Sequence, residues 1–204
     1  MEKIIIFDLL GVITKEPMFA TNIIYPLVKD KISYDLFKKK YLLYAIGTIE
    51  KKDFWEFICT NSSIEKFENR IIKETIITFE IKKIINDLVS SGCVLYLATE
   101  IPKRWGELLL EKAGIKAVFK KKFYSSDLLV TKPFSDFYKK VFKEIKGDEI
   151  YYIDDTLINL IAAKKIKKHT AIYYSIESDQ ASCKEMDYKI NNLKKIIEIC
   201  GIKK

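Results

Sequence analysis

The chain alternates short apolar segments with longer stretches in which apolar residues recur at helical spacing. Several of the short segments are almost continuously apolar, which is typical of strands buried on both faces of a parallel sheet. The predicted strands are residues 3–8, 93–98, 122–125, 149–154 and 170–174. The predicted helices are residues 81–89, 102–109, 133–145, 156–166 and 183–199. Strands that alternate with helices predict an α/β fold with a doubly wound parallel sheet and crossover connections.

One region breaks this alternation. Residues 15–80 show helical spacing, as in Phe37, Tyr41 and Tyr44, and contain no convincing strand. The region is too long for a loop inside a compact domain. We therefore expect a core of residues 1–14 and 81–204, and a helical insertion of residues 15–80 with a satellite core of its own. The insertion should pack over the sheet edge at which the first strand ends.

Composition indicates a globular protein without a membrane span. The chain has 204 residues, 49% of them apolar, and no apolar run reaches the roughly 18 residues that a span requires. The first apolar segment begins within three residues of the N-terminus, which leaves no room for a signal peptide, so a cytoplasmic location is expected. The four cysteines, at positions 59, 93, 183 and 200, lack metal-ligand spacing and are expected to be reduced thiols.

The net charge of +8 comes almost entirely from lysine. The runs Lys38–Lys40 and Lys120–Lys122 lack the glycine and aromatic interleaving of RNA-binding modules, so nucleic acid is not the expected partner. A basic surface favours anionic small molecules by electrostatic steering. The sequence carries no indication of the oligomeric state.

Functional groups follow the predicted strands. Asp8 ends the first, Thr99 follows the second, and Asp154 and Asp155 end the fourth. Lys132 stands before a helix, after the third strand. In doubly wound sheets, ligands bind beyond the carboxyl ends of the strands, where the strand order reverses. Each residue also has a structural alternative: Thr99 and the Asp155-Thr156 pair could cap the helices that follow them, and Lys132-Pro133 could form an exposed turn.

Together these residues fit a site for a divalent cation and a phosphate. Carboxylates that lie close together repel unless a cation sits between them, and Mg²⁺ prefers oxygen ligands. Thr99 and Lys132 could donate hydrogen bonds to a phosphoryl group. Asp8 could then attack phosphorus as a nucleophile, and water would hydrolyse the resulting aspartyl-phosphate.

The pattern resembles the haloacid dehalogenase superfamily over nearly the whole chain. The first motif of that superfamily, an apolar strand followed by D-x-D-G, is similar to "IIIFDLLGVIT" except at its second aspartate. The second, third and fourth motifs are similar to "VLYLATE", "TKPFSDFYKKVF" and "YYIDDTLINLIAA". The segment "YAIGTIEKKDFWEFI" is similar to the helical cap that the superfamily inserts after its first motif.

The resemblance implies a Rossmann-like sheet of order 3-2-1-4-5, dependence on Mg²⁺ and hydrolysis of small phosphorylated metabolites. It makes Asp8 the nucleophile, and Thr99 and Lys132 the groups that hold the phosphoryl oxygens. The implied metal ligands are Asp8, the backbone carbonyl of Leu10, Asp154 and Asp155.

Leu10 departs from the superfamily pattern. In the phosphatases of the superfamily, an aspartate at this position protonates the leaving oxygen and then activates water, and leucine can do neither. Such acid–base catalysis is worth roughly 10²–10⁴ in rate. The protein could therefore be a slow phosphatase, could take a proton from Glu100 in the substrate site, or could be a non-catalytic relative that binds a phosphorylated ligand or a protein partner.

Two other chemistries of the superfamily are minor alternatives. The dehalogenase branch needs an arginine soon after the first motif, and the first arginine here is Arg70. The phosphonate-cleaving branch needs a lysine in the cap, and none here stands in a recognisable context.

Overall fold

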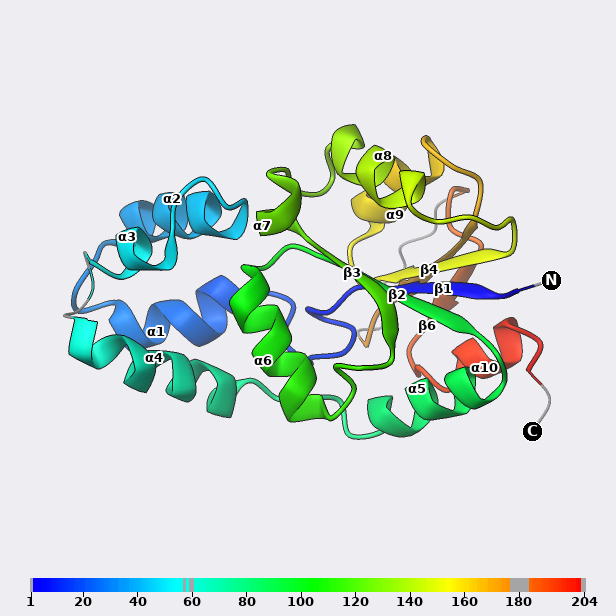
Figure 1. Ribbon diagram of the computed structural model, residues 1–204, viewed down its shortest axis with the longest axis horizontal. Helices are drawn as coiled ribbons and strands as arrows, with labels where there is room; N and C mark the ends of the chain where they lie inside the picture. The colour runs from blue at the N-terminus through cyan, green and yellow to red at the C-terminus, as the bar shows by residue number, and fades with distance from the viewer. Residues whose placement is uncertain (1, 57, 59–60, 177–183, 203–204) are drawn as a thin grey trace.

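The computed structural model describes residues 2–56, 58, 61–176 and 184–202. Within these residues, six parallel strands form one sheet of order β3-β2-β1-β4-β5-β6 (Figure 1). The strands are β1 (Ile4–Phe7), β2 (Val94–Thr99), β3 (Phe119–Tyr124), β4 (Ile150–Asp154), β5 (Thr170–Tyr174) and β6 (Tyr188–Ile190). This confirms the predicted α/β Rossmann-like fold and the order 3-2-1-4-5, to which β6 adds an edge strand.

Helices cover both faces of the sheet. They are α5 (Ile81–Ser90), α6 (Lys103–Ala113), α7 (Ser125–Leu128), α8 (Ser135–Lys143), α9 (Leu157–Lys164) and α10 (Lys195–Ile199). In β1, Ile5 and Phe7 belong to the buried cluster that includes α5, α6 and α10, whereas Ile4 and Ile6 belong to the cluster that includes α8 and α9. Every side chain of β1 is therefore buried, which explains why its sequence is continuously apolar.

Two predicted elements differ from the structure. The third strand begins at Phe119 rather than at residue 122, because β3 is an edge strand and the lysines in it can point to solvent. The predicted helix over residues 183–199 is wrong over most of its length. Tyr188–Ile190 instead pairs with β5, only Lys195–Ile199 is an α-helix, and residue 183 lies outside the described residues.

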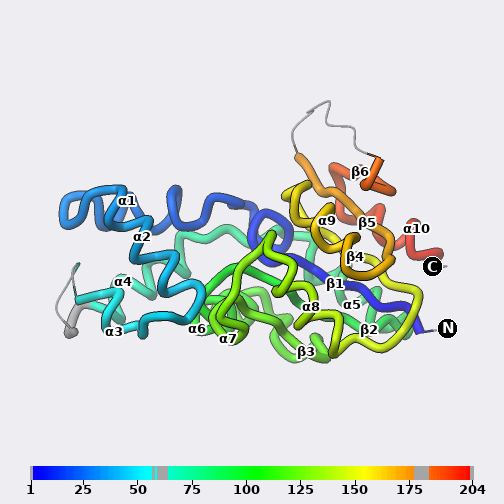
Figure 2. The backbone as a smooth tube through the Cα atoms, turned by 90° about the horizontal axis from the view of Figure 1, so that it is seen from above, coloured from blue at the N-terminus to red at the C-terminus, as the bar shows by residue number. Residues whose placement is uncertain are grey.

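The long region between β1 and β2 is helical, as predicted. Its elements are η1 (Ala20–Ile24, a π-helix), α1 (Tyr25–Val28), α2 (Tyr34–Ala45), α3 (Lys51–Trp55) and α4 (Asn61–Glu74). We call this part the helical insertion; it lies at one end of the molecule, beside α6 (Figures 1 and 2). An antiparallel bridge between Thr14 and Ile77 joins its entry and exit, so the chain leaves the sheet and returns at the same place.

The described residues of the insertion do not form a satellite core, contrary to expectation. Its buried side chains form one continuous cluster with those on one face of the sheet. Trp105 on α6 is fully buried at the junction and provides an aromatic surface that the insertion covers. The rings in contact with it are Phe19, Tyr41, Tyr44, Phe54 and Trp55, with centroids 5.3 to 6.3 Å away. The aromatic residues of the insertion therefore become buried by packing against α6.

Two further expectations can be compared with the structure. None of the helices in the described part of the chain has the length and apolar character that crossing a membrane requires. Cys93 and Cys200 are buried free thiols, whereas positions 59 and 183 lie outside the described residues.

Candidate active site

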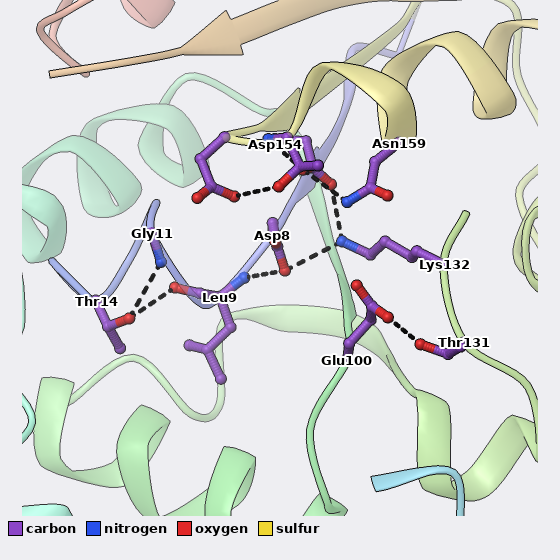
Figure 3. A network of polar contacts seen from close by, with 11 residues as sticks. Asp8, Leu9, Gly11, Thr14, Glu100, Thr131, Lys132, Asp154 and Asn159 are labelled. Atoms are coloured by element: carbon purple, nitrogen blue, oxygen red, sulfur yellow. Dashed lines mark hydrogen bonds and ion pairs between the residues drawn. The ribbon is translucent and has the colours of Figure 1, made fainter. Parts of the chain in front are cut away.

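The carboxyl ends of the central strands bring the predicted functional groups together. Strands β2, β1 and β4 are neighbours in the sheet, so Thr99, Asp8 and Asp154 end or follow adjacent strands at the same edge. Asp155 comes directly after β4, and Lys132 enters from the segment between α7 and α8. Figure 3 shows Asp8, Asp154 and Lys132 pointing toward one another from these separate segments.

Lys132 lies between two carboxylates. Its Nζ is 3.2 Å from Oδ1 of Asp8 and 2.8 Å from Oδ2 of Asp154, and its side chain is fully buried. The exposed-turn alternative for Lys132 is therefore wrong. The carboxylates of Asp8, Asp154 and Asp155 each offer an oxygen within 4.8 Å of the others. Among the described residues, these three carboxylates thus have one ammonium group beside them, that of Lys132.

Hydrogen bonds fix the orientation of the two buried carboxylates. The backbone N–H of Leu9 donates to Oδ1 of Asp8 at 2.7 Å. Oδ1 of Asp154 accepts from the backbone N–H of Thr156 at 2.9 Å and from Nδ2 of Asn159 at 3.0 Å. Thr156 does occupy the N-cap position of α9, although its side chain makes no capping hydrogen bond among the described residues. The carboxylates are held in place before any ligand binds.

The electrostatics of the cluster favour a bound cation. Burial raises the pKa of Asp8 well above its usual value, although Lys132 opposes this effect. Burial, followed by the nearby Asp154, raises the pKa of Asp155 to about 7. Burial lowers the pKa of Lys132, but Asp154 and Asp8 outweigh it and the net shift is upward. Negative charge is therefore in excess, and carboxylate oxygens are the donors that Mg²⁺ prefers.

Thr99 contributes a hydroxyl group that has no hydrogen-bond partner among the described residues. The residue is fully buried, and its Oγ1 makes no hydrogen bond to any residue that the structure describes. The capping alternative is wrong, because α6 has Pro102 at its N-cap and no capping side chain in the described chain. A buried donor without an acceptor costs about 1–3 kcal/mol. A ligand oxygen in the adjacent pocket would satisfy it.

Gly11 permits the close approach of the loop after β1 to Asp155. Its φ of +74° is a left-handed conformation that favours glycine. A Cβ atom at this position would lie only 2.1 Å from Oδ2 of Asp155. The Thr14 hydroxyl braces the same loop by donating to the carbonyl of Leu9 at 3.4 Å and accepting from the N–H of Gly11 at 3.3 Å.

A pocket of about 260 Å³ opens beside these groups. The strand ends and the helical insertion both contribute to its wall. The lining residues are Asp8, Leu10, Pro17, Met18, Phe19, Ala20, Thr21, Tyr41, Thr99, Glu100, Asp155, Thr156 and Asn159. Among the aromatic residues of the insertion, Phe19 and Tyr41 line the pocket, whereas Tyr25, Tyr44 and Trp55 are not among the described lining residues.

Glu100 and Leu10 also line this pocket. The hydroxyl of Thr131, the residue before Lys132, donates a hydrogen bond to a carboxylate oxygen of Glu100. Burial raises the pKa of Glu100 from its usual value, although Lys132 opposes the shift. Thr131 is not among the residues predicted from the sequence, where only its position next to Lys132 indicates a role in the site. The backbone carbonyl of Leu10 stays a predicted metal ligand.

Comparisons with known proteins show similarity to one family of hydrolases. A family model described as haloacid dehalogenase-like hydrolase matches residues 5–173. A search of curated proteins gave no match. Among solved structures, the chain is similar to a phosphatase of this family from Thermococcus onnurineus, with 21% identity, a TM-score of 0.72 and 98% of each chain covered.

Two further solved structures have a similar fold. One is a family enzyme from Bacteroides thetaiotaomicron in complex with magnesium and inorganic phosphate, with 18% identity, a TM-score of 0.66, and 89% of this chain and 98% of that chain covered. The other is L-2-haloacid dehalogenase from Xanthobacter autotrophicus, with 12% identity, a TM-score of 0.69 and full coverage of both chains. At these identities the likeness concerns the fold.

Proposed function

The chain belongs to the haloacid dehalogenase-like hydrolase family, and on this premise we propose that it hydrolyses small phosphomonoesters with Mg²⁺ through an aspartyl-phosphate on Asp8. One observation carries the proposal. Asp8, a buried carboxylate, and Thr99, with an unpartnered hydroxyl, line one small pocket at the carboxyl edge of the sheet, and the buried ammonium group of Lys132 lies 3.2 Å from the carboxylate of Asp8. These groups are a nucleophile and two phosphoryl-oxygen donors.

The donor set fits Mg²⁺. Asp8, Asp154 and Asp155 would hold the ion, and the carbonyl of Leu10 would complete the protein ligands. A bound Mg²⁺ would offset the excess negative charge of the carboxylates and of a phosphoryl group. The leucine side chain at position 10 removes no ligand from this set, because the superfamily uses only the backbone carbonyl at that position.

Asp8 performs the covalent chemistry in this proposal. Its carboxylate oxygen attacks phosphorus, the bond from phosphorus to the leaving oxygen breaks, and an aspartyl-phosphate forms. Lys132 and the Thr99 hydroxyl donate hydrogen bonds to the phosphoryl oxygens while charge develops on them. Water then attacks phosphorus, which releases inorganic phosphate and restores the Asp8 carboxylate.

The pocket limits the substrate. Its volume of about 260 Å³ accommodates a phosphoryl group with a small leaving group. The described lining residues include no lysine, arginine or histidine, but they include Asp8, Glu100 and Asp155. A second anionic group on the substrate would be repelled. We therefore propose that the leaving group is small and uncharged, and that the helical insertion acts as a cap over it.

The experiment combines turnover with a binding readout. The wild-type protein should release phosphate from p-nitrophenyl phosphate with Mg²⁺, and Asp8→Asn should lower kcat by on the order of 10⁴-fold or more. Mg²⁺ alone at about 100 times its Kd should stabilise the wild type by about 2.7 kcal/mol in thermal unfolding. Asp155→Asn should weaken this stabilisation. Turnover equal to that of Asp8→Asn across a panel of phosphate esters would refute the proposal.

A non-catalytic role is the second candidate, and Leu10 is the observation that favours it. A relative without the acid–base carboxylate could bind a phosphorylated ligand and not turn it over. The two candidates separate in the same experiment, because a binding protein would show thermal stabilisation by Mg²⁺ and phosphate without turnover. Dehalogenation gains no support, since no arginine lies among the described lining residues of the pocket.

A further inference from the structure

We propose that Glu100 is the acid–base residue that replaces the carboxylate absent at position 10. The inference rests on the proposed phosphomonoesterase function and assigns the proton that this function requires. It concerns a residue outside the nucleophile, the phosphoryl donors and the metal ligands.

The position of Glu100 is the first argument. It lines the same pocket as Asp8, Leu10 and Thr99. It follows Thr99 directly, so it stands beside a proposed phosphoryl donor at the end of β2. Figure 3 shows its carboxyl group directed toward the space between Asp8 and Lys132. Among the described lining residues, Glu100 is the carboxylate that is not part of the Asp8, Asp154 and Asp155 cluster.

The surroundings of Glu100 are the second argument. The hydroxyl of Thr131 contacts one carboxyl oxygen and fixes the rotation of the group. Burial disfavours the charged form and raises the pKa of Glu100, so the protonated form persists to higher pH than in water. A general acid must hold a proton until the leaving oxygen takes it, and an upward shift of the pKa favours this. A glutamate that merely anchored a loop would not need to face the pocket.

The proposed steps balance. In the first, Asp8 forms its bond to phosphorus, the bond from phosphorus to the leaving oxygen breaks, and the leaving oxygen takes the proton of Glu100. The products are an alcohol, an aspartyl-phosphate and a Glu100 carboxylate. In the second, that carboxylate takes a proton from water while the water oxygen attacks phosphorus. The bond between phosphorus and Asp8 breaks, and inorganic phosphate leaves with both side chains restored.

The test measures how the effect of Glu100→Gln on kcat/KM depends on the leaving group of the substrate. Nitrophenolate departs without a proton, whereas an alkoxide requires one. For n-propyl phosphate, kcat/KM should fall by roughly 10²–10⁴-fold. For p-nitrophenyl phosphate, kcat/KM should fall by less than about tenfold, while kcat falls further and a burst of nitrophenolate appears, because hydrolysis of the aspartyl-phosphate also loses its base.

Two variants serve as controls. Glu107 resembles Glu100 in being partly buried and in accepting a hydroxyl hydrogen bond, from Tyr124 at 2.8 Å, but it is not among the described lining residues of the pocket. Glu107→Gln should leave the kcat/KM of both substrates unchanged. The double variant Leu10→Asp/Glu100→Gln should recover activity on n-propyl phosphate, since it returns a carboxyl group to position 10.

Several outcomes would overturn the inference. An equal loss of kcat/KM on both substrates would make Glu100 a positioning residue. No loss on either substrate would show that Glu100 takes no part in the reaction. Wild-type turnover no higher than that of Asp8→Asn would remove the proposed function and this inference with it. Should Glu100→Gln not fold, Glu100→Ala with added formate replaces it. Formate should then raise kcat/KM for n-propyl phosphate alone, and the absence of this rescue would contradict the role.

Discussion

The protein contains two clusters of charged side chains that are partly or fully buried. The strand-end cluster consists of Asp8, Lys132, Asp154 and Asp155, at the carboxyl edge of the sheet. The Glu68 cluster joins α4 of the helical insertion to α6, and its members are Glu68, Lys51, Arg104 and Trp105. Both contain a charged side chain that is almost completely inaccessible to solvent: Lys132 is 0% exposed and Glu68 is 1% exposed.

The two clusters differ in how completely their charges are balanced and their polar atoms hydrogen-bonded. Glu68 accepts hydrogen bonds from Nε of Arg104 at 2.8 Å and Nε1 of Trp105 at 3.1 Å, so the oxygens of its carboxylate have partners. The strand-end cluster has more carboxylates than cations, lies against the unpartnered hydroxyl of Thr99, and opens into a pocket. Burial of charge alone therefore does not mark a functional site. In this protein, the functional site is marked by unbalanced charge beside a cavity.

Lys132→Met should have the largest effect on stability. It leaves Asp8 and Asp154 buried without their cation, and breaking a buried pair in this way costs about 3–5 kcal/mol. Urea unfolding without Mg²⁺ measures the loss, and Mg²⁺ should recover part of it because it supplies positive charge to the same carboxylates. Lys83→Met, which removes an exposed pair with Asp87, is the control and should change stability little. Equal effects for both variants would contradict the comparison.

Glu68→Gln should have an intermediate effect on stability and little effect on turnover. The amide keeps an oxygen acceptor but loses charge-assisted hydrogen bonds, each worth about 1.5–3 kcal/mol. We expect unfolding to become easier by about 1–3 kcal/mol, with kcat on p-nitrophenyl phosphate within about tenfold of wild type. Lys51→Met is the control, because that ammonium is 3.4 Å away and partly exposed. A collapse of kcat without loss of stability would place the Glu68 cluster in the catalytic machinery.

Tyr41→Phe should have the smallest effect, and it tests the link between the two clusters. The Tyr41 ring stacks on Trp105 with centroids 6.3 Å apart, and the same residue lines the pocket. The variant keeps the ring, so the free energy of unfolding should change by less than about 0.5 kcal/mol. Loss of one hydrogen bond of about 0.5–1.5 kcal/mol should raise KM by roughly 2–10-fold for substrates that reach the hydroxyl. An unchanged KM across the panel would show that Tyr41 only supports the wall.

The sequence determined the sheet and most of the strand-end cluster. The apolar runs of β1, β2 and β4 mark strands buried on both faces, and Asp8, Thr99 and Asp154 stand at or just beyond their ends. These features lie within a few consecutive residues, so local patterns encode them. The resemblance supplied the strand order, which places the three ends side by side.

Only the tertiary structure decided which residues from distant parts of the chain meet. Glu100 and Thr131 are 31 positions apart, and Glu68 and Trp105 are 37 apart. No local pattern relates such pairs, because their contact depends on how α4, α6 and the segment before α8 pack against one another. The same reason explains why Tyr41, rather than Tyr25, faces the site, and why the insertion shares its core with α6 through Trp105. Apolar spacing determines that a side chain is buried, and packing determines what it is buried against.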